Sequence, residues 1–388
     1  MKRIKKSPWA FIVLLGIISL FSDMTHEGSR SITGPYLALL GASATVVGFV
    51  AGFGELIGYA FRLITGLIAD KTKKYWTITV IGYLVNLLAV PALALAGNWQ
   101  MAAVLMMLER LGRAIRNPAR DTMLSYATSS VGHGKGFGIH EALDQIGAVT
   151  GPLIVGAVYY FSEDYRQSFA VLLIPAIVAI SILVVARMVY PDTKGMETPD
   201  KSAVNIRFKR FYWLYLIGVS LIAAGFADYP LIAFHFTKTA QVPLHWIPAM
   251  YAIAMGVDAL AAILLGRFFD KYGMKTLIIS TAFSIAFAPL VFMGNFYTAI
   301  LGMICWGVGM AAQESVMRAV LASVLPIEKR ATGFGVFNAV FGLFWFLGSF
   351  LMGWLYDISL LWLVVFSVII QSISIPFFIK LLKYNDDL

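Results

Sequence analysis

The sequence predicts an all-α membrane protein whose twelve transmembrane helices form two pseudo-symmetric six-helix bundles. Three observations predict this fold class: an apolar composition, a series of long apolar runs, and a repeat that relates the two halves of the chain. Of the 388 residues, 59% are hydrophobic and only 13% are charged. In an average soluble domain about a quarter of the residues are charged. The composition therefore indicates an integral membrane protein.

The apolar runs define the twelve expected spans. A hydrocarbon core of about 30 Å needs about 20 mostly apolar residues per helix, and breaks at Gly, Pro and clusters of charge separate runs of this length. The spans are expected near residues 9–40, 44–69, 75–97, 99–128, 134–161, 167–189, 210–238, 244–269, 275–294, 296–325, 330–357 and 360–380. The first and the fourth spans are unusual because both carry several charged residues.

The basic residues predict the orientation of these spans. They gather in alternate loops, which the positive-inside rule places in the cytoplasm together with both termini. The protein is thus expected to be a multi-pass protein of the cell membrane. Its formal net charge of +9 follows from this topology, so no nucleic-acid partner is expected. The single cysteine, Cys305, excludes an internal disulfide. No metal or cofactor is expected, and the chain is expected to be a monomer in the lipid bilayer.

A repeat and a polar stretch predict the domain organisation. Residues 191–209 contain Pro191, Gly195 and Pro199, which is typical of a flexible linker. It would join an N-terminal bundle, residues 1–190, to a C-terminal bundle, residues 210–388. The sequence Gly136-Phe137-Gly138 recurs 197 residues later as Gly333-Phe334-Gly335. A collinear series of such matches indicates a duplication, and transporters built this way place their site near the middle of the membrane.

The first span carries a stripe of ionisable residues. Asp23, His26, Glu27 and Arg30 are separated by steps that place them on one face of an α-helix. A charge at the centre of a bilayer costs at least about 2.5 kcal/mol. These side chains must therefore face other parts of the protein or a water-filled cavity, which indicates a polar interior at membrane depth.

A paired loop motif supports the same class of protein. Gly66, Asp70 and Lys71 recur 200 residues later as Gly266, Asp270 and Lys271, and the second copy continues through Gly273 to Lys275. The second copy resembles the loop signature of the major facilitator superfamily, and the first copy keeps the Gly and the Asp but lacks the second Gly.

The resemblance covers the whole chain and implies secondary transport by alternating access. It also implies that both copies of the motif act in gating, with the helix starts near Thr332 and Gly134 as candidate partners of the two aspartates. Asp121, at the cytoplasmic end of the fourth span, is assigned to the same gating group. The alternative is that the acids are solvated loop residues placed by topology.

The fifth span contains Gly147, Gly151, Pro152 and Gly156. This pattern is similar to the antiporter motif of the drug–proton branch of the superfamily, although Val155 replaces the first of its two final glycines. The resemblance favours export. Glycines four residues apart also allow close packing of helices, so the same residues are open to a purely structural interpretation.

The fourth span departs from the family pattern because it carries several arginines. Arg113, Arg116 and Arg120 share one helix face, where they could bind an anionic substrate. Alternatively, they pair with Glu109, Asp121 and acids of other spans, as buried charges usually do. Pairing is the favoured interpretation for most of them.

These residues predict a proton-coupled secondary transporter that exports a small organic or amphipathic solute by antiport. Burial raises the pKa of a carboxyl group and a neighbouring arginine lowers it, so an acid under both influences can exchange a proton. The expected proton-coupling residues are Asp23 and Glu27, with Glu55, Glu141 and Asp144 as secondary candidates. The expected substrate-binding residues and counter-charges are His26, Arg30, Arg62, Arg110, Arg113 and Trp345. A static network of ion pairs is the structural alternative.

Other functions stay open at this point. One alternative is a proton-coupled symporter that imports an anionic metabolite on the arginines of the fourth span. A lesser alternative is export of a divalent metal through Asp23, Met24, His26 and Glu27, which the nearby Arg30 disfavours. An enzyme is not expected, because the chain has no nucleophile motif and no Walker loop. The linker is too short to hold a signalling domain, which argues against a sensor.

Overall fold

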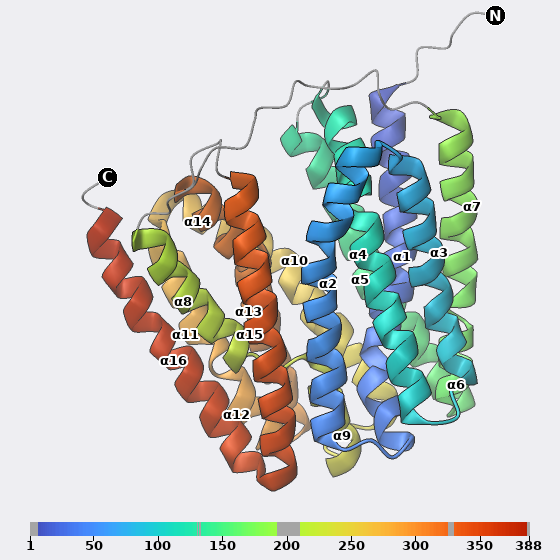
Figure 1. Ribbon diagram of the computed structural model, residues 1–388. Helices are drawn as coiled ribbons and strands as arrows, with labels where there is room; N and C mark the ends of the chain where they lie inside the picture. The colour runs from blue at the N-terminus through green and yellow to red at the C-terminus, as the bar shows by residue number, and fades with distance from the viewer. Residues whose placement is uncertain (1–6, 130, 132, 192–209, 325–329, 386–388) are drawn as a thin grey trace, which may run out of the picture. The chain divides into compact units, whose positions relative to one another are not determined.

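The computed structural model describes residues 7–129, 131, 133–191, 210–324 and 330–385, and all of their regular structure is helical (Figure 1). Eleven helical segments of this part of the chain are long and apolar enough to cross a membrane. The fourth expected span is helical too but is more highly charged. The predicted fold class is confirmed: the chain is an all-α membrane protein whose helices form two bundles.

Contacts divide the chain into two compact units, and the division falls inside two helices. Unit 1 comprises residues 1–30 and 57–200, and unit 2 comprises residues 31–56 and 201–388. The last nine residues of the first helix and the first thirteen residues of the second helix thus pack with the C-terminal part of the sequence. The expected bundles 1–190 and 210–388 stay a prediction. The expected linker, 191–209, lies outside the described residues except for Pro191.

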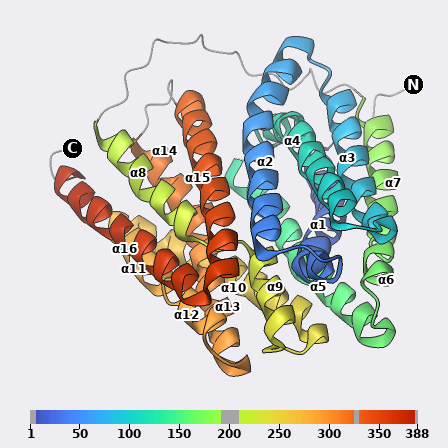
Figure 2. The same cartoon turned by 60° about the horizontal axis from the view of Figure 1, so that its bottom comes forward.

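Unit 1 contains α1 as far as Arg30, α2 from Ile57 onward, and the helices from α3 to α7. Their bounds are α1 Pro8–Leu39, α2 Ala44–Thr72, α3 Tyr75–Ala92, η1 Leu93–Leu95, α4 Trp99–Ser129, α5 His133–Ser162, α6 Tyr165–Ala170 and α7 Leu173–Val189. The helix α3 packs against both α4 and α7 (Figures 1 and 2). At the α3–α4 crossing, a Cβ atom on Gly82 would lie 2.8 Å from the carbonyl oxygen of Gly112. Only glycine permits this approach of two backbones.

Aromatic side chains hold the start of α3 against the end of α7. Trp76 Nε1 donates a hydrogen bond of 2.8 Å to the carbonyl oxygen of Tyr190. The ring of Phe11 lies edge-on to Trp76, with centroids 6.1 Å apart, and 4.8 Å from the ring of Tyr190. Because all three rings are buried, they fix the ends of three helices of unit 1.

Unit 2 contains the remaining helices, several of which are interrupted. Their bounds are α8 Arg210–Gly225, α9 Tyr229–Thr239, η3 Leu244–Trp246, α10 Ile247–Tyr272, α11 Met274–Ser284, α12 Phe287–Phe292, α13 Phe296–Ala311, the π-helical η4 Ala312–Val316, α14 Met317–Val324, α15 Arg330–Ile358 and α16 Leu360–Asn385. The span expected at 210–238 is broken before Tyr229, whose N–H donates to the carboxylate of Asp228 at 2.8 Å. The helix α8 packs against α15 and α16 (Figures 1 and 2).

The segment 31–56 is bound to α15 within unit 2. Asp357 accepts hydrogen bonds from the backbone N–H groups of Ala44 and Thr45, at 3.1 and 2.8 Å, and from the Thr45 hydroxyl at 2.6 Å. Farther along α2, a Cβ atom on Gly48 would lie 2.2 Å from the carbonyl oxygen of Ser349. The carboxylate of Asp357 therefore satisfies amides that the first turn of α2 leaves unpaired.

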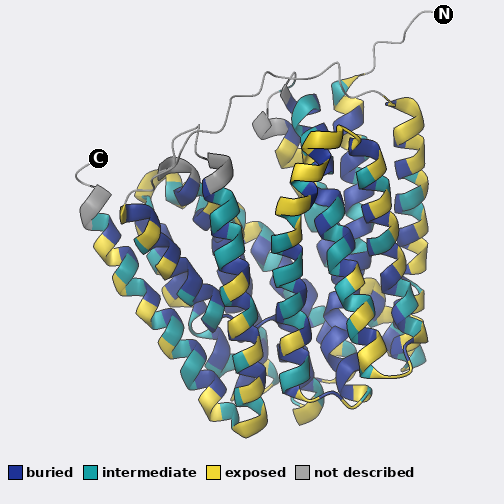
Figure 3. Ribbon diagram, viewed as in Figure 1, coloured by how far each residue is buried: buried dark blue, intermediate teal, exposed yellow. Residues whose placement is uncertain are grey.

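The burial pattern agrees with helices that face lipid. Several long helices combine buried residues with exposed apolar ones (Figure 3). On α7, for example, Ala176, Ala179 and Leu183 are buried, whereas Ile177 and Val185 are exposed. Large apolar side chains on an outer face are stable only in an apolar solvent, as expected for a bilayer.

Candidate functional site

Unit 1 holds a cluster of ionisable side chains at membrane depth, supplied by α1 and α4. It forms because the stripe of α1 and the charged face of α4 can each avoid lipid only by facing the other. Most of its side chains are buried, and none is fully exposed. We call this set the charged cluster; its members are Asp23, His26, Glu27, Arg30, Glu109, Arg110, Arg113 and Arg116.

The tight part of the charged cluster surrounds Glu109. His26 Nδ1 lies 2.7 Å from Glu109 Oε1, and Asn86 Nδ2 donates to the same oxygen at 2.6 Å. Because a carboxylate only accepts, Nδ1 of His26 carries the proton of this hydrogen bond. The other nitrogen of the imidazole, Nε2, lies 3.4 Å from Arg110 Nη1 and 3.5 Å from Glu27 Oε1. This part of the cluster is held by short, directional bonds.

The loose part of the charged cluster surrounds Asp23. Its Oδ1 atom lies 3.8 Å from Nη2 of Arg113 and 3.8 Å from Nη2 of Arg116. These distances allow Coulomb attraction but exceed those of a hydrogen bond. The same Oδ1 is buried and has no hydrogen-bond partner among the described residues. Asp23 is therefore a buried carboxyl group whose charge is compensated only at a distance.

Arg113 bridges the two acids of the α1 stripe and is the more accessible of their partners. Its Nη1 lies 3.8 Å from Glu27 Oε1, and Glu27 Oε2 lies 3.9 Å from Arg30 Nη1. The side chain of Arg113 is 23% exposed, whereas that of Arg116 is 1% exposed. The guanidinium of Arg116 also lies over the Tyr83 ring, 4.4 Å from its centroid. Arg116 is thus locked in the core, and Arg113 keeps room for another partner.

A second group of polar contacts continues along α4. Arg120 Nη2 pairs with Asp121 Oδ1 at 2.8 Å, and its Nη1 donates to the Ser19 hydroxyl at 3.1 Å. On α5, Asp144 Oδ2 lies 3.3 Å from Nδ1 of His140. The predicted pairing of the fourth-span arginines is therefore seen for Arg113, Arg116 and Arg120. The carboxylate of Asp121, assigned to gating, is half exposed.

Several expected site residues lie outside the charged cluster. Glu141 is exposed and accepts from Gln145 Nε2 at 3.4 Å. Arg62 lies half-buried with its guanidinium 5.4 Å from the centroid of the Tyr59 ring. Glu55 is half-buried on the part of α2 that belongs to unit 2.

Trp345 belongs to a buried aromatic group of unit 2. Its Nε1 lies 3.4 Å from Asp228 Oδ2, and its ring packs against Phe226 and Phe341. Its role in binding a substrate stays a prediction.

The residues of the paired loop motif are largely exposed. The side chains of Asp70, Lys71, Asp270 and Lys271 reach the surface of their own units. The expected partners near Thr332 and Gly134 lie outside the residues whose side chains are described. A Cβ atom on Gly66 would lie 3.7 Å from Pro118, and one on Gly266 would lie 4.0 Å from Ser315. Their roles in gating stay a prediction.

The glycines of the antiporter-like motif pack against α1. A Cβ atom on Gly147 would lie 2.3 Å from the carbonyl oxygen of Leu20, and one on Gly151 would lie 2.2 Å from that of Met24. Pro152 is buried beside them, and Gly156 is half-buried. This close crossing of α1 and α5 accounts for Gly147 and Gly151 by packing alone.

Three polar partners of these charged groups were not expected from the sequence. They are Asn86, Tyr83 and Ser19, which contact Glu109, Arg116 and Arg120 respectively. Asn86 was detectable, because an amide inside an apolar span must find a hydrogen-bond partner. No group of three His, Cys, Asp or Glu side chains that could hold a metal ion is found in the described part of the chain. The metal-export alternative thus has no support in this geometry.

Helical proteins that cross the membrane many times and bury paired charges at membrane depth typically move polar solutes across the bilayer. Comparison with known proteins specifies the class. The Major Facilitator Superfamily model matches residues 9–237 and 211–385, and the chain belongs to this family of secondary transporters.

Individual proteins are similar to this chain over most of its length. The chain is 37% identical to the protein Rv2265 of Mycobacterium tuberculosis over 380 residues, which cover 95% of this chain and 92% of the relative. It is 25% identical to the multidrug resistance protein MdtH of Photorhabdus laumondii, over 83% of this chain and 80% of the relative. The fold is similar to that of a crystallised peptide transporter, POT, in complex with sulfate. That match has a TM-score of 0.79 and 13% identity, and covers 97% of this chain and 94% of the other.

Proposed function

We propose that this transporter is a proton-coupled antiporter that exports a small organic or amphipathic solute. The observation that carries the proposal is the position of Asp23. Its Oδ1 atom is buried, lacks a hydrogen bond within the described residues, and is attracted by two guanidiniums at 3.8 Å. A carboxyl group in this position can lose a proton to become the partner of two cations, or gain one to remove a buried charge.

The arrangement suggests how proton and solute compete. In the ionised state, Asp23 and Glu27 both attract Arg113. Protonation of either acid releases part of this attraction and frees Arg113, the most exposed arginine of the charged cluster, to contact a solute. The His26–Glu109 bond keeps α1 and α4 in register while these charges change. Proton movement and solute movement are then coupled, because the proton and the solute cannot use the same charged groups at the same time.

Export is favoured by similarity to MdtH, which is named for multidrug resistance, and by the resemblance of the fifth span to the antiporter motif. The close packing of Gly147 and Gly151 explains those glycines without reference to export. The direction of transport therefore rests on the relative rather than on the motif.

The test uses the purified protein in liposomes that contain a pH-sensitive dye. A panel that includes tetracycline, ethidium and tetraphenylphosphonium is added outside, and proton movement evoked by each compound is recorded. We expect Asp23→Asn to abolish the evoked proton flux while the protein stays folded. The matched control is Glu163→Gln, which removes an exposed acid directly after α5. Unchanged flux in Asp23→Asn would sink the proposal.

A second candidate function is import of an anionic metabolite by symport. It is favoured by the four arginines of the charged cluster, which outnumber its three acids, and by the accessibility of Arg113. Carboxylates and phosphates belong in the same liposome panel for this reason. Uptake of such an anion that is lost in Arg113→Ala, together with no response to the lipophilic cations, would favour symport over antiport.

A further inference from the structure

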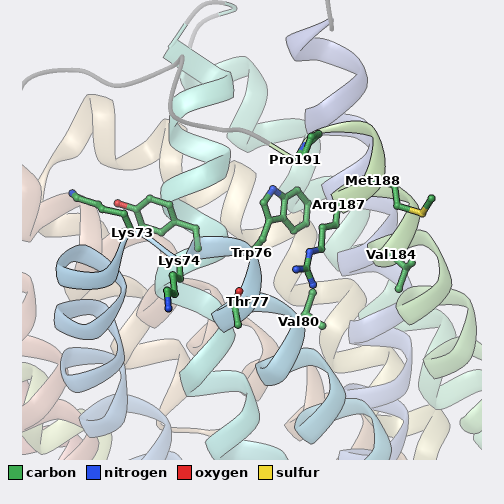
Figure 4. Close-up of a pocket in the computed structure, with 10 residues that line it drawn as sticks. Lys73, Lys74, Trp76, Thr77, Val80, Val184, Arg187, Met188 and Pro191 are labelled. Carbon is green, nitrogen blue, oxygen red and sulfur yellow. The ribbon is translucent and has the colours of Figure 1, made fainter.

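A cavity of about 590 Å³ lies in unit 1 and shares no lining residue with the charged cluster (Figure 4). Its walls come from the loop between α2 and α3, the first turns of α3, and the last turns of α7. Three of its lining residues are cations: Lys73, Lys74 and Arg187. None of the ten lining residues is acidic, and no carboxylate among the described residues pairs with any of the three. The cavity is therefore a concentrated positive site without a partner in the described chain.

Cationic and apolar side chains both line the cavity. Figure 4 shows Lys73 and Lys74 on one side of Trp76 and Arg187 on the other, with Val184 and Met188 beyond it. The three cations are exposed, and so is most of Met188. Farther from the loop, α3 and α7 present exposed apolar residues that include Ile81, Leu84, Ile177 and Val185. A molecule with an anionic head and an apolar tail matches this combination.

Lys73 has a backbone conformation that glycine adopts more easily. Lys73 has a φ angle of +53°, and Gly273, its equivalent in the second copy of the loop motif, has a φ angle of +55°. This left-handed conformation suits glycine and is disfavoured for a lysine. The first copy of the motif thus keeps a cation at a backbone position where glycine would be easier to accommodate.

The loop that carries Lys73 and Lys74 belongs to the set that the positive-inside rule assigns to the cytoplasm. Anionic phospholipids are concentrated in the cytoplasmic leaflet, and basic pockets between helices on that side bind their headgroups. A cavity of this size is within the range of specific ligand sites.

We propose that this cavity, named here the α3–α7 pocket, binds one anionic phospholipid. Its phosphate pairs with cations of the pocket lining, and its acyl chains lie against the exposed apolar residues of α3 and α7. The rigid wall of the pocket is Trp76, which its hydrogen bond to Tyr190 holds in place. The bound lipid links the α2–α3 loop to the end of α7, and so stabilises unit 1 at the end where the chain leaves it.

The test uses the full chain in a neutral detergent, with lipid removed and then added back. Native mass spectrometry measures binding of dioleoyl phosphatidylglycerol, dioleoyl phosphatidylcholine and inorganic phosphate. We expect phosphatidylglycerol to bind at least ten-fold more tightly than phosphatidylcholine. The combined variant Lys73→Gln, Lys74→Gln, Arg187→Gln should lose this preference. The matched control Arg166→Gln, Lys275→Gln, Lys380→Gln removes three exposed cations elsewhere and should keep it.

A single substitution separates lipid binding from folding. Lys73→Gly relieves the backbone conformation, so thermal unfolding should occur at the same or a higher temperature, while affinity for phosphatidylglycerol falls several-fold. Equal affinity in the pocket variant and the control variant would overturn the proposal. So would displacement of phosphatidylglycerol by an equal concentration of inorganic phosphate, because the site would then bind free phosphate rather than a lipid.

Discussion

His26 Nδ1 and Glu109 Oε1 lie 2.7 Å apart, and the same oxygen accepts a second hydrogen bond from Asn86. Glu109 therefore joins α1, α3 and α4 through one carboxylate. The neighbouring Asp23 differs, because its guanidinium partners are 3.8 Å away. The charged cluster thus combines a rigid part around Glu109 with a loosely held part around Asp23. Substitutions in the two parts should have different effects on stability and transport.

Replacing Glu109 should destabilise the fold. Glu109→Ala leaves His26 and Asn86 without their shared acceptor and the nearby arginines without a counter-charge, at a cost of about 3 kcal/mol. Unfolding can be followed by circular dichroism, which reports the loss of helix in both units. The control Glu163→Ala removes an exposed acid and should unfold like the parent protein. A Glu109→Ala protein as stable as this control would refute the anchoring role.

Of the two arginines beside Asp23, Arg116 should mainly affect stability and Arg113 should mainly affect transport. Arg116→Gln removes a buried cation that also contacts the Tyr83 ring, so we expect a loss of stability of about 2 kcal/mol or more. Arg113→Gln removes a more accessible cation, and should change transport rates more than it changes the unfolding temperature. Parallel measurements of unfolding and of proton flux in liposomes check both. Equal stability losses in Arg116→Gln and Arg113→Gln would contradict these separate roles.

The crossing of α1 and α5 predicts a steric effect at Gly151. Gly151→Ala places a methyl group 2.2 Å from the Met24 carbonyl oxygen, so the helices must separate, at a cost of about 1–3 kcal/mol. Gly138→Ala is the control on the same helix, where an added Cβ meets no atom within 4 Å. There the expected change is neutral or slightly stabilising. Thermal unfolding distinguishes the two, and equal behaviour would show that the crossing is not tight.

The Asp357 carboxylate should protect the first turn of α2. Asp357→Ala removes the acceptor of the Ala44 and Thr45 amides, which costs about 1 kcal/mol. Hydrogen–deuterium exchange of a peptide that spans residues 44–50 should accelerate several-fold. Asp164→Ala serves as the control, since Asp164 caps only the short helix α6. Unchanged exchange at residues 44–50 would show that other contacts hold this segment.

Much of the charged cluster could be predicted because charge in an apolar span restricts where a helix face can point. The stripe of Asp23, His26, Glu27 and Arg30 and the arginines of α4 were found in this way. The individual pairs could not be predicted. Arginines three or four residues apart on one face can each reach the same acids, so the register of α1 against α4 selects the pairs.

Other features were hidden for different reasons. The break before Tyr229 carries a recognisable helix-start signal, an Asp followed by a Pro two residues later, but high apolarity masks it within one long span. The amino-acid composition of residues 31–56 does not indicate that this segment packs with unit 2. It depends on backbone contacts such as that between Gly48 and Ser349, and these arise only after the helices are packed.

The charge of α4 constrains how the protein is made. Arg110, Arg113, Arg116 and Arg120 together would oppose release of this helix from the translocon by on the order of 10 kcal/mol. Several of their partners, Asp23, His26, Glu27 and Ser19, lie on α1, which is synthesised first. We therefore expect α1 to enter the membrane first and to offer the acids onto which α4 docks.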